Sequence, residues 1–400
     1  MLISNRVSRR AVMVAGLGLV LSVAACFWVS PARGQQAARG VETVPGMPPV
    51  ADPANLYSET RFDKLSPTVA NALPRVYVPN LKSNDVYVID PATLKVVDRF
   101  RVGINPQHIV PSYDLKTLWV TNNAEGRTDG SLTPIDPTTG KPGKPIAVDD
   151  PYNMYFSPDG RSAIVVAEAL KRLDFRDPQT MALQKSIEVP QCGGINHADF
   201  SIDGRFVIFT CEFQGSLAKI DLVGSKVLGY LKYLKLSKGG MPQDIRVSPD
   251  GKTFFVADMK ADGVFLVDGD SFKETGFIKT GVGTHGLYPS RDGTKLYVVN
   301  RGSNHVHGKP RGKGSVSVVD FATRQVVATW PIPGGGSPDM GNVSADGKAL
   351  WLSGRYDDVV YVIDTASGEV RTIAVGKEPH GLTVWPQPGR YSLGHTGNMR

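Results

Sequence analysis

Cysteine is scarce in this chain, with three residues among 400, and several catalytic signatures are missing from the sequence. There is no paired-cysteine zinc motif and no Cys-x-x-Cys-His haem attachment. There is also no Gly-x-Ser-x-Gly elbow and no phosphate-cradling glycine loop. These absences argue against c-type haem, serine-triad hydrolysis and nucleotide use.

Excess charge is also limited. The formal net charge is +7, but four arginines lie within residues 1–34, and without that segment the charge falls to +3. Such an excess is too small to indicate binding to nucleic acid or to a membrane surface. Nucleic acid is therefore not expected as a partner.

A short sequence motif recurs seven times along the chain. It is clearest at Met241–Lys252, where it reads Met-Pro-Gln-Asp-Ile-Arg-Val-Ser-Pro-Asp-Gly-Lys. One slot near its start is always polar, and four of the seven slots carry histidine. In chain order the slot holds His108, Asn153, His197, Asp244, His285, Asp339 and His380. The spacings run from 41 to 54 residues. Periods near 40–45, with four strands per unit, are typical of propeller blades.

Each repeat also contains short β-branched and aromatic runs, such as Val76–Val78 and Leu296–Val299, bounded by Asp-Gly, Pro or Gly. No part of the repeat region has a sustained helical period. The first repeat lacks its first strand and begins at its second, near Arg75. The last repeat consists of a first strand only, Pro379–Trp385. Pairing these partial units closes a ring and removes exposed edges. The sequence therefore predicts an all-β, seven-bladed propeller of four-stranded blades over residues 70–386.

Some of these phrases are similar to those of a known family. Trp119–Asn122 and Tyr297–Asn300 are similar to a Tyr-Val-Thr-Asn phrase, and Val86–Asp90 is similar to its companion, Val-x-Val-Ile-Asp. On these residues the repeats resemble the YVTN-family β-propellers, which are exported bacterial proteins. The resemblance implies the fold but no particular reaction, because propellers carry unrelated chemistries.

The N-terminus is typical of an export signal. Residues 1–34 combine a basic segment, an apolar stretch at 11–29 and a small-x-small cleavage site at Ala32-Arg33-Gly34; Ser8-Arg9-Arg10 resembles a twin-arginine signal. We expect a periplasmic or secreted protein without a membrane span after signal removal. Val23–Cys26 also resembles a lipoprotein box, so anchoring through Cys26 is an alternative, as is an uncleaved anchor. Residues 35–69 are expected to form an N-terminal extension, and residues 387–400 a polar tail.

The other two cysteines, Cys192 and Cys211, fall in one repeat. Antiparallel pairing about the turn at Asp203-Gly204 brings both near the same rim of the blade. An oxidising compartment favours a disulfide between them. A metal-ligand role for Cys211, or two free thiols, are the alternatives.

The slot residues carry the functional prediction. Inner strands of a propeller begin at the mouth of its central channel, which would gather His108, His197, His285 and His380 around one opening. Imidazole suits copper, zinc, iron and nickel, and it also serves as a general acid or base. A metal site using these histidines, metal-free ligand binding, and a merely hydrogen-bonded polar rim are the three hypotheses that this pattern allows.

Other polar residues are expected at the same mouth. The ligand-binding candidates Arg301, Arg355 and Glu212 lie at the ends of the second strands of their repeats. Asp244 and Asp339 are candidates that occupy the slot itself. The long loop at 301–314 is basic and rich in glycine, and it contains His305-Val306-His307. It is either a solvated loop or a lid that attracts an anion or brings His305 or His307 to the metal.

Together these features predict an exported propeller that binds a transition metal, copper being favoured, and a small anionic molecule. If the protein is an enzyme, it is a metal-dependent oxidoreductase or lyase. The alternative is a non-catalytic scaffold of the cell envelope, whose top face docks another envelope protein or a polymer.

Overall fold

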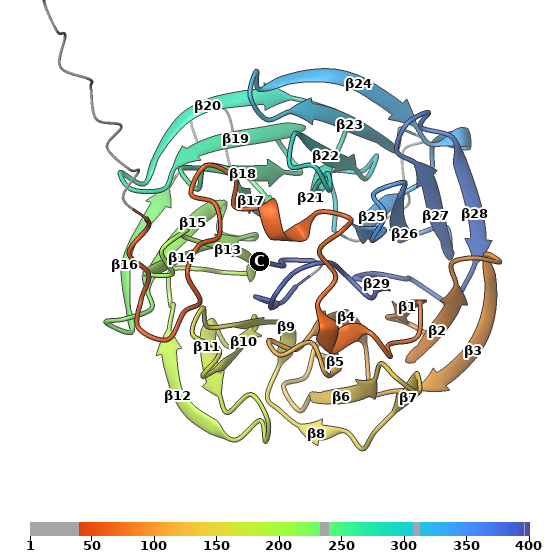
Figure 1. Cartoon of the computed structure of the whole chain (residues 1–400), viewed down its shortest axis with the longest axis horizontal. Coiled ribbons are helices and arrows are strands. Elements are labelled where there is room, and N and C mark those ends of the chain that lie inside the picture. The colour runs from red at the N-terminus through yellow and green to blue at the C-terminus, as the bar shows by residue number, and fades with distance from the viewer. Residues whose placement is uncertain (1–39, 233–239, 307–312, 396) are drawn as a thin grey trace, which may run out of the picture. The chain divides into compact units, whose positions relative to one another are not determined.

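A computed structural model of the chain describes residues 40–400 except 233–239, 307–312 and 396. Within these residues, seven β-sheets are arranged as blades around a central axis (Figure 1). The prediction of an all-β, seven-bladed propeller is therefore confirmed. The predicted export signal, with Cys26, lies outside the described residues.

One blade combines the two ends of the repeat region. Its order is β29 (Thr383–Trp385), β1 (Arg75–Asn80), β2 (Asp85–Asp90) and β3 (Lys95–Arg101). Strands β29 and β1 are antiparallel, with Trp385 opposite Arg75 and Thr383 opposite Tyr77. The predicted ring closure is confirmed, and it leaves β1 paired along both of its edges.

The other six blades follow one another along the chain, and each places its first strand nearest the axis. Their strands are β4 (Pro106–Pro111), β5 (Leu118–Asn122), β6 (Ser131–Asp136), β7 (Lys141–Pro142) and β8 (Ile146–Ala147); β9 (Pro151–Phe156), β10 (Ala163–Ala167), β11 (Arg172–Arg176) and β12 (Leu183–Glu188); β13 (Ile195–Phe200), β14 (Phe206–Cys211), β15 (Ser216–Asp221) and β16 (Lys226–Lys232); β17 (Pro242–Val247), β18 (Thr253–Asp258), β19 (Gly263–Asp268) and β20 (Lys273–Lys279); β21 (Thr284–Pro289), β22 (Lys295–Asn300), β23 (Ser315–Asp320) and β24 (Gln325–Pro331); and β25 (Pro338–Val343), β26 (Ala349–Gly354), β27 (Val359–Asp364) and β28 (Val370–Ala374).

The apolar core lies between neighbouring blades. In one cluster Ile164 and Val166 of β10 pack with Phe209 of β14 and Ala198 of β13, all fully buried. Outer strands such as β3 are largely exposed. Each fully buried large apolar side chain stabilises the fold by about 1.5–3 kcal/mol. The faces between blades therefore stabilise the propeller and leave the axis free for polar side chains.

Helix is confined, in the described ranges, to three short 3-10 turns: η1 (Ser58–Thr60), η2 (Pro67–Val69) and η3 (Pro333–Gly335). None of the helices found there is long and apolar enough to cross a membrane. Both η1 and η2 belong to the segment before β1, which packs on the propeller. The Tyr57 hydroxyl donates to the Val247 carbonyl over 2.6 Å.

The C-terminal residues differ from the polar tail that the sequence predicted. Tyr391, Leu393 and Met399 are buried, Ser392 pairs with Met399, and the Arg400 guanidinium contacts Asp199 over 2.6 Å. The end of the chain lies near the middle of the ring of blades (Figure 1). Apolar side chains that alternate with small and polar ones allow this segment to fill the centre, where a solvated tail was expected.

Candidate functional site

The inner strands are irregular where the polar slot lies. In all six blades that begin with their inner strand, the register against the second strand shifts at or beside the slot residue. A β-bulge bends a strand and re-aims its side chains. The repeat therefore carries its polar residue to the same place in each blade, at the axis of the propeller.

Five imidazoles meet at this axis, and we call them the histidine cluster: His108, His197, His285, His380 and His395. The ring centroids of His108 lie 4.7 Å from His380, 5.6 Å from His197 and 4.5 Å from His395. His395 also lies 4.4 Å from His197. All five side chains are buried. The structure thus brings together the four histidines chosen from the sequence and adds a fifth.

Sequence reasoning missed His395 because it lies outside the repeat, in the segment taken for a tail. Its backbone N–H donates to the Met154 carbonyl on β9 over 3.2 Å. Gly394 pairs with Tyr155 on the same strand. The C-terminal segment therefore positions this imidazole against the inner strands, and no periodic signal could have revealed it.

Asp339 organises one side of the cluster. Its carboxylate lies 2.9 Å from Nδ1 of His380, 3.0 Å from Nδ1 of His285 and 2.7 Å from Nη2 of Arg301. Burial alone would raise the pKa of Asp339, but Arg301 and then His285 lower it well below its usual value. The ionised carboxylate fixes His380 with Nδ1–H toward Asp339, which leaves Nε2 facing the cluster.

His285 is engaged at both of its ring nitrogens. Nδ1 faces Asp339, whereas Nε2 lies 2.6 Å from Nη2 of Arg301. Because a guanidinium can only donate, Nε2 of His285 accepts this bond. His285 is therefore better placed to position Arg301 and Asp339 than to bind a metal, although the sequence grouped it with the other three histidines.

Three other side chains at the axis form a group that could hold a metal ion. Ligand atoms of His197, Asp244 and His395 all lie within 4.8 Å of one another. Asn153 donates from Nδ2 to Nδ1 of His197 over 3.2 Å, because its own Oδ1 accepts from the Met154 N–H. Burial raises the pKa of Asp244 to about 6, although Arg246 opposes the shift.

The cluster consists of neutral imidazoles with unused nitrogens. Burial lowers the pKa of His380 to about 4 and those of His108, His197 and His395 well below the usual value. Six of their ring nitrogens are buried without a hydrogen-bond partner in the described part of the chain: both of His108, both of His395, and Nε2 of His197 and of His380. Buried polar groups are normally satisfied, so such a concentration indicates a missing partner.

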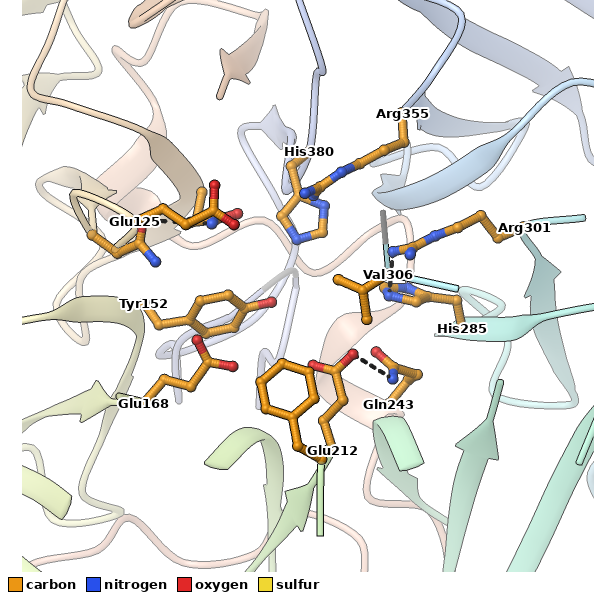
Figure 2. Close-up of a pocket in the computed structure, with 13 residues that line it drawn as sticks. Glu125, Tyr152, Glu168, Glu212, Gln243, His285, Arg301, Val306, Arg355 and His380 are labelled. Carbon is orange, nitrogen blue, oxygen red and sulfur yellow. Dashed lines mark hydrogen bonds between the residues drawn. The ribbon is translucent and has the colours of Figure 1, made fainter. Parts of the chain in front are cut away.

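A small pocket opens above the cluster, with His285 and His380 in its lining and a volume of about 60 Å³. Figure 2 shows Arg301 and Arg355 on one side of it, and Tyr152 and Glu168 on the other. Residues one position before the slot, Gln107, Tyr152 and Gln243, also line it. Sequence reasoning overlooked them, although this position is polar in five of the seven repeats and is proline in the other two.

The remaining site candidates lie at or near this pocket. Arg301, Arg355 and Glu212 line the pocket, whereas Asp244 and Asp339 lie buried at the axis. In the long loop, Val306 lines the pocket and its carbonyl accepts from the Tyr356 hydroxyl, but His305 is exposed. His307 lies outside the described residues.

Cys192 and Cys211 are joined by a disulfide in this structure. The bond links the segment before β13 to the end of β14, directly before Glu212. Both sulfurs are thereby engaged, so Cys211 has no thiolate to offer a metal.

A YncE-like β-propeller family model matches residues 35–388, and the chain belongs to this family. Among individual relatives, the uncharacterised protein YncE of Salmonella typhi is 26% identical over 295 residues, which span 68% of this chain and 75% of the relative. The YncE protein of Salmonella typhimurium is 25% identical over 294 residues and the same shares.

Solved structures with a similar fold belong to proteins of diverse activity. Hydrazine synthase of Kuenenia stuttgartiensis aligns with a TM-score of 0.58 and 18% identity, covering 71% of this chain and 91% of that chain. Dihydro-haem d1 dehydrogenase NirN aligns with a TM-score of 0.56 and 15% identity, covering 86% of this chain and 79% of that chain. At these identities the likeness shows the propeller fold alone.

Proposed function

We propose that this YncE-like propeller binds a transition metal, copper being favoured, in its histidine cluster. The observation that carries the proposal is the set of six buried ring nitrogens, on neutral imidazoles, that have no hydrogen-bond partner among the described residues. Leaving such nitrogens buried without partners costs about 1–3 kcal/mol each. A metal ion bound by the one lone pair that each neutral imidazole offers would remove this cost for the nitrogens that accept, and neutral imidazole is the form that binds metals.

The ligand set that we propose centres on His197, Asp244 and His395, and His197 would give up the hydrogen bond that its Nδ1 accepts from Asn153 when it binds the ion. The ligand atoms of this set lie within 4.8 Å of one another. Bonds of about 2.1 Å separate two ligands of one ion by at most about 4.2 Å, so these side chains would draw slightly closer on binding. His108 and the Nε2 of His380 are adjacent donors. His380 has the carboxylate-supported orientation that is common among metal-binding histidines.

Copper is favoured on the chemistry of the donors. A site rich in imidazole and with one carboxylate suits copper, zinc, iron or nickel, and copper(II) binds such donors most tightly of the common divalent ions. When bound, such an ion polarises an oxygen or exchanges electrons. The pocket lined by His285 and His380 gives a small molecule access, and Arg301 and Arg355 would orient an anionic group on it. A metal-dependent oxidoreductase or lyase is the class of enzyme that this arrangement would serve.

The location that we propose is periplasmic or extracellular. It rests on the basic and apolar pattern of residues 1–34 and on the disulfide between Cys192 and Cys211. Disulfides persist in oxidising compartments and are rare in the cytosol.

Elemental analysis of the full chain, produced with its own N-terminus and exported, tests the metal. We expect about one ion per chain. His197→Gln and His395→Gln should each lower the occupancy, because each removes one imidazole ligand at nearly constant volume. His305→Gln is the matched control and should retain the metal, since its imidazole is exposed on the loop.

Protein purified without metal should also gain thermal stability when copper(II) is added. Binding at about 100 times the dissociation constant stabilises a fold by about 2.7 kcal/mol. Absence of metal in the native protein, together with no thermal shift on adding copper, would leave the non-catalytic envelope scaffold as the better function.

A further inference from the structure

The pocket above the histidine cluster has two walls of opposite charge, and the proposed metal does not account for this. Arg301 and Arg355 lie on one side, Glu168 and Tyr152 lie on the other, and Glu212 lies between Glu168 and Gln243 (Figure 2). Both arginines are almost completely buried, as is Glu212. Burying two guanidiniums and the carboxyl of Glu212 around about 60 Å³ is costly unless these groups find partners.

The cationic wall carries more positive charge than its own partner neutralises. Asp339 is the carboxylate shared by Arg301, at 2.7 Å, and Arg355, at 3.8 Å. Nη1 of Arg301 and Nε of Arg355 are buried without a hydrogen-bond acceptor among the described residues. These unused guanidinium donors are suited to a carboxylate or similar oxyanion.

The anionic wall is built to keep carboxylates in place. Glu212 accepts from Asn196 Nδ2 over 2.8 Å and from Gln243 Nε2 over 3.0 Å. Burial raises the pKa of Glu168 well above its usual value, and Glu212, Asp150 and Glu125 shift it in the same direction. A cation placed between Glu168 and Glu212 would favour the ionised form of Glu168 and would pair with both carboxylates.

We propose that the pocket binds a small zwitterion, such as a simple α-amino acid, with its oxyanion at Arg301 and Arg355 and its ammonium at Glu168 and Glu212. A volume of about 60 Å³ accommodates a ligand of a few non-hydrogen atoms. This inference deepens the ligand part of the proposed function, in which only an anionic group was required, and it does not depend on the metal.

Calorimetric titration of the full-length protein with three probes at equal ionic strength tests the proposal. Glycine carries both charges, whereas acetate and methylammonium each carry one. Each charge-assisted contact is worth about tenfold or more in affinity, so glycine should bind at least about tenfold more tightly than either single-charge probe. Acetate or methylammonium binding as tightly as glycine, or no binding of glycine, would overturn the proposal.

Two variants test which wall of the pocket binds the ammonium group and which binds the carboxylate. Glu168→Gln should weaken glycine about tenfold to a hundredfold while leaving acetate unchanged, and Arg355→Gln should weaken both. Glu188→Gln and Arg161→Gln, at exposed positions outside the pocket, should change neither affinity. Loss of acetate binding in Glu168→Gln would contradict the assignment of the walls. The wild-type comparison of probes remains decisive if a variant does not fold.

Metal content measured on the same samples separates the two proposals. Bound metal without glycine binding overturns the zwitterion pocket and leaves the metal site standing. Glycine binding by protein that contains no metal supports the zwitterion pocket and overturns the metal site.

Discussion

At the scale of single residues, Asp339 connects the two parts of the site. It faces His285 and His380 in the cluster and Arg301 and Arg355 in the pocket. A single buried carboxylate thus orients two imidazoles and balances part of the charge of two guanidiniums. The positioning of both the proposed metal donors and the proposed oxyanion site depends on this side chain.

Replacing this carboxylate should be severely destabilising. Asp339→Asn keeps the shape but leaves the two buried guanidiniums without their anion, and breaking a buried ion pair in this way costs about 3–5 kcal/mol. Urea unfolding of the variant and its parent measures the loss. Asp129→Asn removes the partner of Arg127 in an exposed pair and should have no measurable effect. A loss of less than about 1 kcal/mol in Asp339→Asn would contradict the role given to Asp339.

The half-buried Glu168 should make the stability of the protein depend on pH. Because burial raises its pKa in the folded state, the folded protein binds this proton more tightly than the unfolded chain. That contribution is complete below about pH 4.3, the usual value for glutamate, and is lost as the pH rises through the folded pKa. Glu168→Gln in ligand-free protein should therefore melt at a higher temperature than its parent at pH 8, with a smaller gain at pH 5. A gain that is equal at both pH values, or that also occurs in Glu188→Gln, would contradict this origin.

At the scale of elements, the structure agrees with the sequence-based prediction within the repeat region and differs from it outside that region. The periodic slot predicted the inner strands, the ring closure and four histidines of the cluster, because one side chain recurring at one period occupies equivalent places in a closed ring. Periodicity could not separate His285 from the other three, since its engagement with Arg301 depends on one blade and its neighbour.

The C-terminal segment shows the other limit of sequence reasoning. Residues 387–400 have no counterpart among the blades, so their composition alone suggested solvent exposure. In the structure their backbone joins β9 through Gly394, and their apolar side chains are buried. Such a position depends on the shape of a channel that exists only after the blades have closed. His395 could therefore be found only from the folded chain.

At the scale of the whole molecule, two elements from the end of the chain complete the propeller in different ways. Strand β29 closes the ring by pairing with β1, whereas the segment that follows fills the centre and supplies His395. The first contribution removes a sheet edge, and the second buries apolar side chains and completes the histidine cluster. Closure and site assembly can therefore be separated by two deletions.

Deleting residues 387–400 should leave a folded ring with a lower melting temperature and less bound metal, because β29 still pairs with β1 while Tyr391, Leu393, Met399 and His395 are lost. Deleting residues 379–400 also removes β29 and exposes the inner edge of β1, which favours aggregation and a broad transition. Calorimetry and elemental analysis of both proteins measure these effects. The shorter deletion retaining full metal occupancy would exclude His395 as a ligand. The longer deletion remaining soluble with unchanged melting would show that ring closure does not stabilise the fold.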